Sequence, residues 1–280
     1  MQVGFVGLGN LGLPMAQTLV RAGWSVSVYD TETSRVEECA RAGATTVGSA
    51  REAAGGGLVA LAVPDDEAVT GLLTGADGLL ESMEPGSVVV VHSTVLPRTA
   101  LAMSAAGRQH GIGVLDAPVS GGPARAAEGD LTVMVGGDPE PVERAGPLLR
   151  AVGSNVLHVG PSGAGAAVKL ANQLMLFSAL AGAHEALQLA AAYDVPEDEV
   201  LRVARTSLGD SWVVRNWGFF DEMAEAYDRV GTPVRERSWS KDLWDVVATA
   251  RDTGLQLPVA GLLAQHVTGL VEDHARRDRG

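Results

Sequence analysis

The chain has 280 residues, 46% of them hydrophobic and 20% charged, which excludes a disordered protein and indicates two folded domains rather than one. The formal charge of −13, with no basic cluster, argues against nucleic acid as a partner. Cys39 is the single cysteine, so no internal disulfide is possible, which is typical of the reducing cytoplasm.

Neither a signal peptide nor a membrane span is predicted. The N-terminus passes directly into a strand pattern. The longest uncharged apolar stretch, residues 170–183, is shorter than a helix needs to cross a bilayer. We therefore expect a cytoplasmic protein that does not bind membranes.

The first element is a buried strand over residues 2–8, followed by a helix that ends at Gly23. Between them lies GLGNLG, a Gly-x-Gly-x-x-Gly motif formed by Gly7, Leu8, Gly9, Asn10, Leu11 and Gly12. In such a loop the first glycine makes the tight turn and the second lets the backbone approach a pyrophosphate. The third glycine allows close helix–strand packing. The sequence therefore predicts a dinucleotide site here.

A second strand, SVSVYD, ends at Asp30, 18 residues after Gly12. A carboxylate at this distance accepts hydrogen bonds from the adenosine ribose and repels a 2′-phosphate, so NAD is favoured over NADP. The alternative is a turn residue or a cap for the helix that begins near Thr33.

Strands continue to alternate with helices, at about Thr45 and over 58–64, 87–94, 112–119, 131–137 and near Val156. Ser93 and Thr94 end one of these strands, at the carboxyl edge where doubly wound sheets bind ligands. The loop 120–130 begins with Ser120, Gly121 and Gly122, whose hydroxyl and N–H groups suit a carboxylate. An ordinary glycine-rich turn is the alternative.

From Gly163 the pattern is helical, with helices to about Tyr193, from Pro196, over 240–253 and over 258–275. We predict an α/β fold, with a Rossmann-type doubly wound sheet in residues 1–162. An all-helical domain follows in 163–280, and a long interdomain helix joins the two.

That long helix contains PSGAGAAVKLANQ, in which Lys169, Asn172 and Gln173 share one face. Gly163 and Gly165 allow its first turn to approach a ligand or another backbone closely. A lysine in so apolar a helix needs a partner or a function, and the alternative is a lysine that reaches the surface from a core helix.

Four segments occur in the order and spacing of the β-hydroxyacid dehydrogenases: GFVGLGNLGLPMA, DAPVSGGPARAAEGDLTVMVGG, GAGAAVKLANQ and KDL at 241–243. The chain resembles this family, which includes 3-hydroxyisobutyrate dehydrogenase and tartronate semialdehyde reductase and has 6-phosphogluconate dehydrogenase as a larger relative. The resemblance implies a substrate site between a Rossmann domain and a helical domain. Apolar helices that we expect to be exposed suggest an oligomer, either a homodimer or a homotetramer.

The resemblance also assigns residue roles. It implies that Lys169 is the catalytic lysine, that Ser120, Gly121 and Gly122 hold the substrate carboxylate, and that Lys241 reaches the substrate and the cofactor. Cofactor contacts are implied for Gly7, Gly9, Gly12, Val63, Pro64 and Thr94. Asp242 is expected to orient its segment.

The chain departs from the family pattern at three places. Many members have asparagine four residues after the lysine, where this chain has Gln173, so either Asn172 or Gln173 could contact the substrate. Arg125 replaces a small residue, and we expect a solvated loop arginine rather than a contact to a second anionic group. The segment 207–244 holds four of the five tryptophans and could line a pocket, form a subunit interface or fill a core.

The implied reaction is reversible hydride transfer between a small β-hydroxyacid and its semialdehyde or ketoacid, with NAD as cofactor and no metal. Lys169 would act as general base in oxidation and as general acid in reduction. An imine reductase on the same scaffold is one alternative, although those relatives usually lack the lysine. Decarboxylating 6-phosphogluconate chemistry is a second, although that group carries histidine three residues after its lysine, where this chain has Asn172. A non-catalytic NAD-binding module is the third.

Overall fold

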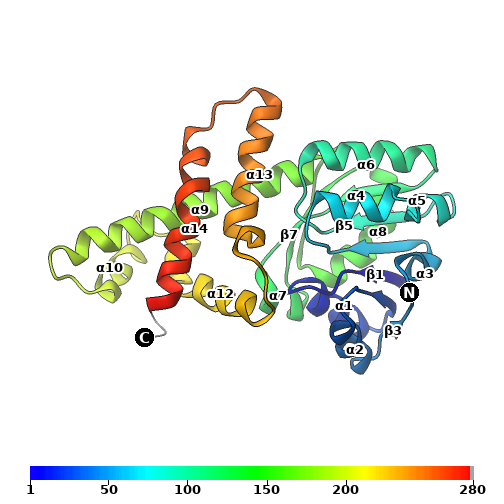
Figure 1. Cartoon of the computed structure of the whole chain (residues 1–280), viewed down its shortest axis with the longest axis horizontal. Helices are drawn as coiled ribbons and strands as arrows, with labels where there is room; N and C mark the ends of the chain where they lie inside the picture. The colour runs from blue at the N-terminus through cyan, green and yellow to red at the C-terminus, as the bar shows by residue number, and fades with distance from the viewer. Residues whose placement is uncertain (278–280) are drawn as a thin grey trace. The chain divides into compact units, whose positions relative to one another are not determined.

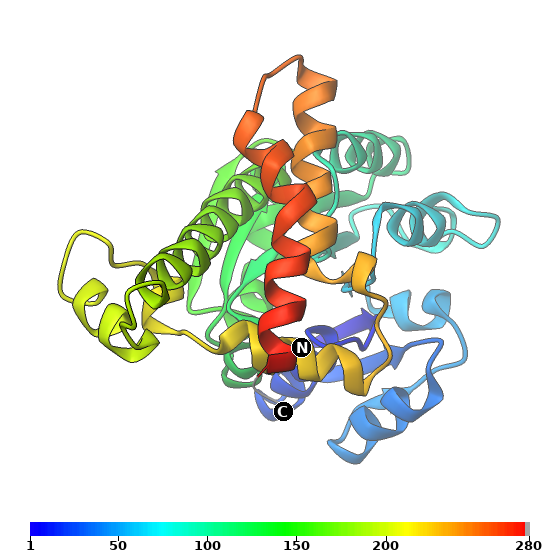
Figure 2. The ribbon, with the colours of Figure 1, turned by 60° about the vertical axis from the view of Figure 1, so that its left-hand side comes forward.

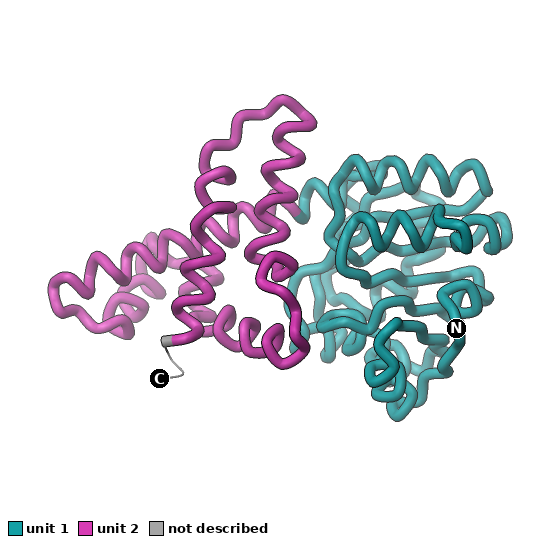
Figure 3. Tube along the Cα trace, in the orientation of Figure 1, with its two compact units in different colours: residues 1–169 teal, residues 170–280 magenta. Residues whose placement is uncertain are grey.

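The computed structural model describes residues 1–277 (Figure 1). The chain forms two compact units, Met1–Lys169 and Leu170–Gly280 (Figure 3). The division falls inside the long helix α9 (Ala164–Ala191). The domain boundary after residue 162 stays a prediction.

The first unit is built on one sheet in the order β3-β2-β1-β4-β5-β6-β8-β7, with β9 paired to β8. The six strands from β1 to β6 are parallel, whereas β8 is antiparallel to β6 and to β7. The strands are β1 (Gln2–Val6), β2 (Ser25–Tyr29), β3 (Thr45–Thr46), β4 (Leu58–Leu61), β5 (Val88–Val91), β6 (Gly113–Asp116), β7 (Val119–Ser120), β8 (Thr132–Gly136) and β9 (Asn155–Gly160).

Helices cover both faces of this sheet, which is why its central strands are apolar without interruption. In β5, Val88 and Val90 contact the core on one face, and Val89 and Val91 contact the core on the other. The helices are α1 (Gly12–Arg21), α2 (Thr33–Arg41), α3 (Ala50–Ala53), α4 (Asp66–Thr74), α5 (Leu79–Ser82), α6 (Pro97–Gln109), α7 (Gly122–Glu128) and α8 (Pro139–Val152), with a 3₁₀ turn at Ala54–Gly56.

The predicted Rossmann-type sheet is confirmed, with one correction in its strands. The single strand expected over 112–119 is two strands, β6 and β7, because the chain changes direction at Ala117-Pro118. Proline has no N–H group to extend a ladder. Strand β6 therefore ends at Asp116, and β7 pairs antiparallel to β8.

The second unit is helical, as predicted. It contains most of α9, then α10 (Glu197–Ala204), α11 (Trp212–Arg215), α12 (Phe219–Arg229), a 3₁₀ turn at Val234–Glu236, α13 (Ser238–Thr253) and α14 (Pro258–Arg277). Helices α13 and α14 lie side by side as a hairpin (Figures 1 and 2). Gly254, with φ of +70°, ends α13, and Pro258 begins α14.

Helix α9 is 28 residues long, with a mean hydropathy of 1.3 over its most apolar window. By length and composition it could therefore cross a membrane, although the uncharged stretch within it, residues 170–183, is shorter than a span needs. The core helix of a soluble protein can meet the same two criteria.

Candidate functional site

The loop between β1 and α1 holds three glycines in three different surroundings. Gly7 has φ of +91°, and a Cβ there would lie 2.4 Å from the Ala62 carbonyl oxygen. A Cβ on Gly12 would lie 2.0 Å from the Gly7 oxygen, so only glycine allows α1 to start this close to the loop. At Gly9, no atom lies within 4 Å of the Cβ position. The loop is thus packed on two sides and open at Gly9, which fits the approach of a pyrophosphate.

Asp30, at the end of β2, is bound directly to this loop. Its Oδ2 accepts a hydrogen bond from the Leu8 N–H, and its Oδ1 accepts one from the Glu32 N–H at 2.8 Å. Arg35 donates to the Leu8 carbonyl oxygen at 3.0 Å. Asp30 is therefore a turn residue, and it also faces the dinucleotide loop. Because a carboxylate has about four lone-pair positions, it can still accept bonds from a ribose. These residues fit a dinucleotide.

The carboxyl ends of neighbouring strands bring the other candidate cofactor contacts to the same edge of the sheet. Val63 follows β4, and its N–H donates to the Ser93 hydroxyl, after β5, at 2.9 Å. Thr94 is half-buried beside it, and Pro64 is exposed. The chain runs outward from β1 through β2 to β3 and then crosses to β4, so this edge contains the topological switch point where such sheets bind ligands.

The loop expected to hold a carboxylate connects β7 to α7. Gly121 and Gly122 have φ of +146° and +76°, so two successive residues adopt conformations that favour glycine. Ser120 is half-buried at the start of the loop. Arg125 is ion-paired with Asp130 in its own segment, at 2.9 Å.

Lys169 lies in the second turn of α9 and is only 7% exposed. The alternative of a lysine extending to the surface is therefore wrong. Gly165, four residues before it, serves a close backbone contact. A Cβ on Gly165 would lie 2.4 Å from the Met134 carbonyl oxygen, so α9 starts in direct contact with β8.

The carboxamides belong to a polar network inside the helical unit. Gln173 is buried, and its Nε2 donates to Asp242 Oδ2 at 2.7 Å. The ammonium of Lys241 is 2.7 Å from Asp245 Oδ2 and 3.7 Å from Asp242 Oδ1. Asn172 is half-buried, and its Nδ2 lies 3.5 Å from the Gln173 oxygen. Asp242 thus joins α9 to α13.

Known proteins resemble the chain over nearly its whole length. The family model for the NAD-binding domain of 6-phosphogluconate dehydrogenase matches residues 2–160, and the model for the NAD-binding region of NADP-dependent 3-hydroxyisobutyrate dehydrogenase matches residues 163–279. An NAD-dependent L-serine dehydrogenase of Pseudomonas aeruginosa is 37% identical over 99% of this chain and 95% of its own. A 3-hydroxyisobutyrate dehydrogenase of the same organism is 33% identical, with 99% and 93% covered.

The chain belongs to the β-hydroxyacid dehydrogenase family. A structure of Mycobacterium tuberculosis 3-hydroxyisobutyrate dehydrogenase with L-serine agrees with the fold, with a TM-score of 0.84, 29% identity and 98% and 94% of the two chains covered. A Streptomyces aurantiacus imine reductase shares the fold at 19% identity and a TM-score of 0.69. The dehydrogenase function is therefore favoured over imine reduction, and the sheet unit is an NAD(P)-binding domain.

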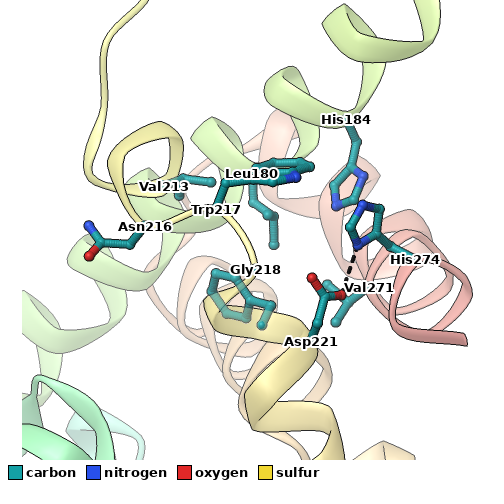
Figure 4. A pocket seen from close by; sticks show the side chains of 10 residues that line it. Leu180, His184, Val213, Asn216, Trp217, Gly218, Asp221, Val271 and His274 are labelled. Atoms are coloured by element: carbon teal, nitrogen blue, oxygen red, sulfur yellow. Dashed lines mark hydrogen bonds and ion pairs between the residues drawn. The ribbon is translucent and has the colours of Figure 1, made fainter. Parts of the chain in front are cut away.

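In this β-hydroxyacid dehydrogenase, the tryptophan-rich segment serves several purposes. Trp239 is fully buried and belongs to the core of the helical unit, whereas Trp212 and Trp244 are 44% and 51% exposed. Trp217 lines a small pocket with His184 and His274, and the two histidine rings lie edge to face with centroids 5.1 Å apart (Figure 4). Through residue 277, the structure contains no group of three or more side chains arranged to hold a metal.

Two buried polar residues of this dehydrogenase were not singled out from its sequence. Asp116 ends β6 and accepts hydrogen bonds from the N–H groups of Gly163 and Ala166. His92 follows β5, with Nδ1 2.8 Å from the Ala117 oxygen and Nε2 unpartnered. Burial lowers the pKa of the His92 imidazole to about 4. In both cases the sequence feature that could have identified the residue is a single ionisable side chain at the end of an apolar strand.

Proposed function

We propose that this chain catalyses the reversible NAD-dependent oxidation of a small β-hydroxyacid to its semialdehyde or ketoacid, with Lys169 as general acid and base. The observation that supports this role is the burial of a lysine in the second turn of α9, in a chain of this family. Burial disfavours the charged form of a lysine, and a general base works best when its pKa is close to the working pH.

Lys169 takes the proton of the substrate hydroxyl during oxidation and returns a proton to the carbonyl oxygen during reduction. The bound nicotinamide accepts or gives the hydride. Ser120 and the N–H groups of Gly121 and Gly122 hold the substrate carboxylate. The glycine turn, with positive φ at both residues, supports this role because turns of this kind can present successive N–H groups to an anion.

The two carboxamides have different tasks. Gln173 already donates to Asp242 at 2.7 Å, so it positions α9 against α13. Asn172 makes only a 3.5 Å contact with its neighbour, which leaves its amide available to hold the substrate oxygen or the lysine. Asn172 therefore replaces the asparagine that many relatives carry one position later.

NAD is the preferred cofactor, and the loop 7–12, Asp30, Val63, Pro64 and Thr94 bind it. Asp30 supports this preference because its carboxylate lies against the dinucleotide loop, where it would repel a 2′-phosphate. Lys241 contacts the substrate and the cofactor from α13, and Asp242 and Asp245 hold its ammonium in place.

The names of the relatives limit the kind of substrate to be expected. L-serine, 3-hydroxyisobutyrate and L-threonate all have a carboxylate and a hydroxyl group within three carbons of it. We expect a substrate of that size. Exposed apolar side chains of the helical unit, among them Met175, Leu189 and Leu262, support a homodimer or homotetramer, and the composition supports a cytoplasmic location.

The test is an NAD-linked screen of the full chain with small 3-hydroxyacids, including sulfonate and phosphonate analogues. NADH formation with at least one compound of this screen is the expected result. Cyclic imines assayed with NADH and NADPH provide the comparison with imine reduction. Imine turnover without hydroxyacid turnover would contradict the proposal. Binding of NAD without any turnover would leave only a cofactor-binding module.

A further inference from the structure

Asp116 is a buried carboxylate in an otherwise apolar strand end, and it binds the start of α9. It is 3% exposed. Its Oδ1 accepts a hydrogen bond from the Gly163 N–H at 2.8 Å, and its Oδ2 accepts one from the Ala166 N–H at 2.9 Å. These partners are 47 and 50 residues further along the chain. One side chain from the end of β6 thus caps the first turn of the helix that carries Lys169.

Backbone packing around this carboxylate brings the first turn of α9 into direct contact with the ends of β6 and β8. A Cβ on Gly165 would lie 2.6 Å from the Asp116 carbonyl oxygen and 2.9 Å from the Gly136 nitrogen. A Cβ on Gly136 would lie 2.6 Å from Asp116 Oδ2. Gly163 adopts φ of +87°, which favours glycine. The ends of β6 and β8 and the start of α9 therefore form one close-packed joint.

Capping alone does not require a charged group at this place. Serine, threonine and asparagine cap helices about as well, and burial makes a carboxylate costly. Burial does raise the pKa of the Asp116 carboxyl, against the opposing effect of its backbone N–H partners. The carboxylate, unlike an amide, offers two acceptor oxygens, and both are used here. Asp116 therefore fixes two N–H groups three residues apart, which sets both the position of α9 along its axis and its rotation.

The joint lies close in sequence to two candidate site elements. Lys169 comes three residues after Ala166, which is almost one helical turn. Ser120 comes four residues after Asp116, at the end of β7. A small rotation of α9 at the joint would move the lysine ammonium relative to the loop that starts at Ser120.

We propose that Asp116 is a positioning residue, which clamps the first turn of α9 to the ends of β6 and β8 and thereby sets Lys169 against the Ser120–Gly122 loop. This inference rests on the proposed roles of Lys169 and of that loop. Asp116 contacts neither substrate nor cofactor. Its effect on turnover passes through the backbone of α9.

The test compares Asp116→Asn with Ser49→Ala in the full-length enzyme. Ser49 caps α3 through its hydroxyl, which accepts the Glu52 N–H at 3.1 Å, and α3 carries no candidate site residue. The readouts are kcat per NADH-binding site, KM for the hydroxyacid, the pH profile of kcat and Kd for NADH.

For Asp116→Asn we expect kcat to fall about 10- to 100-fold, as a misplacement of about 1 Å does elsewhere. KM for the hydroxyacid should rise, and Kd for NADH should stay within about twofold, because β4 and β5 separate β1, which leads into the dinucleotide loop, from β6 in the sheet. The limb of the pH profile that reports the base should move, because a displaced first turn of α9 changes the surroundings of the Lys169 ammonium. Ser49→Ala should change none of these values.

A second variant, Gly136→Ala, disturbs the joint from β8 and should lower kcat with the same unchanged Kd for NADH. If Asp116→Asn and Gly136→Ala only lower Tm, with kcat per site and the pH profile unchanged, Asp116 is a plain cap and the inference is overturned. Lys169→Ala separates this failure from a failure of the proposed function. Normal turnover in Lys169→Ala would overturn both proposals.

Discussion

The two compact units hold their candidate site residues by different means. In the sheet unit, both loops are shaped by backbone: the dinucleotide loop has carbonyl oxygens where a Cβ on Gly7 or Gly12 would lie, and the carboxylate loop has two successive glycines at positive φ. In the helical unit, Gln173, Asp242 and Lys241 are held by side chains that bind one another across α9 and α13. A backbone-shaped site depends on glycine identity and strand order, whereas a network of side chains depends on every partner in it.

Lys169 is the last residue of the sheet unit, and its replacement gives the largest expected effect. Lys169→Ala should lower kcat by about 10²- to 10⁴-fold, because the general acid and base is removed. Kd for NADH should stay within about twofold, since the dinucleotide loop is untouched. Steady-state kinetics and NADH fluorescence titration measure both values. Glu185→Ala, which removes an exposed charge from the same helix, is the control and should keep normal turnover. Turnover in Lys169→Ala close to normal would refute the assignment.

The same contrast explains what the sequence could predict. Gly7, Gly12 and the strand pattern were predictable because each reports a local backbone geometry, and the structure gives those glycines the expected contacts. The Gln173–Asp242 hydrogen bond could not be predicted, because it joins residues 69 positions apart on two helices. Asp116 was overlooked for the same reason, since its partners lie 47 and 50 residues away.

Two tryptophans of the tryptophan-rich segment differ in burial, so residue type alone does not predict what each contributes to stability. Trp239 is fully buried, and its Nε1 donates to Glu272 at 3.1 Å, whereas Trp244, five residues later, is 51% exposed. Trp239→Ala should lower the free energy of unfolding by about 3–5 kcal/mol. Trp244→Ala should change it by no more than about 0.5 kcal/mol. Urea unfolding at a fixed protein concentration measures both. Equal losses would show that Trp244 is buried in a subunit interface instead.

His92 is a buried, titratable side chain of the sheet unit. Its pKa is lowered by burial from 6.5 to about 4, so between these pH values the unfolded chain binds a proton that the folded chain does not. The contribution of neutral His92 to the free energy of unfolding is therefore fully present above pH 6.5 and decreases as the pH falls toward 4. From pH 7 to pH 4.5 the loss due to this group should be about 2–3 kcal/mol.

His92→Asn can keep the hydrogen bond to the Ala117 oxygen without titrating. Urea unfolding at pH 7 and at pH 4.5 should show a smaller loss for this variant than for the unmodified protein. His110→Asn is the control, and it should follow the unmodified protein because an exposed imidazole meets solvent in both states. Parallel losses in all three proteins would mean that His92 becomes hydrated or moves before the chain unfolds.

Replacing two glycines of the dinucleotide loop tests whether this site of the sheet unit depends on its backbone geometry. Gly9→Ala places a methyl group where no protein atom lies within 4 Å, so Tm should hardly change while Kd for NADH rises about tenfold or more. Gly12→Ala forces a Cβ to within 2.0 Å of the Gly7 oxygen and should lower Tm as well. Calorimetry and fluorescence titration distinguish the two outcomes. Unchanged NADH binding in Gly9→Ala would show that the open space at Gly9 is not the cofactor's path.

Asp30 is the one place in the sheet unit where a charge, not the backbone, is expected to choose the ligand. Asp30→Asn keeps an oxygen that can accept the Leu8 N–H, so the loop should stay in place while the repulsion of a 2′-phosphate disappears. The ratio of kcat/KM for NAD to that for NADP should fall about tenfold. Glu32→Gln removes an exposed charge from the same turn and should change the ratio much less. Arg35 donates a hydrogen bond to the Leu8 oxygen, so a positive charge also lies beside the loop. A preference for NADP in the unmodified enzyme would therefore mean that Arg35, rather than Asp30, decides the choice of cofactor.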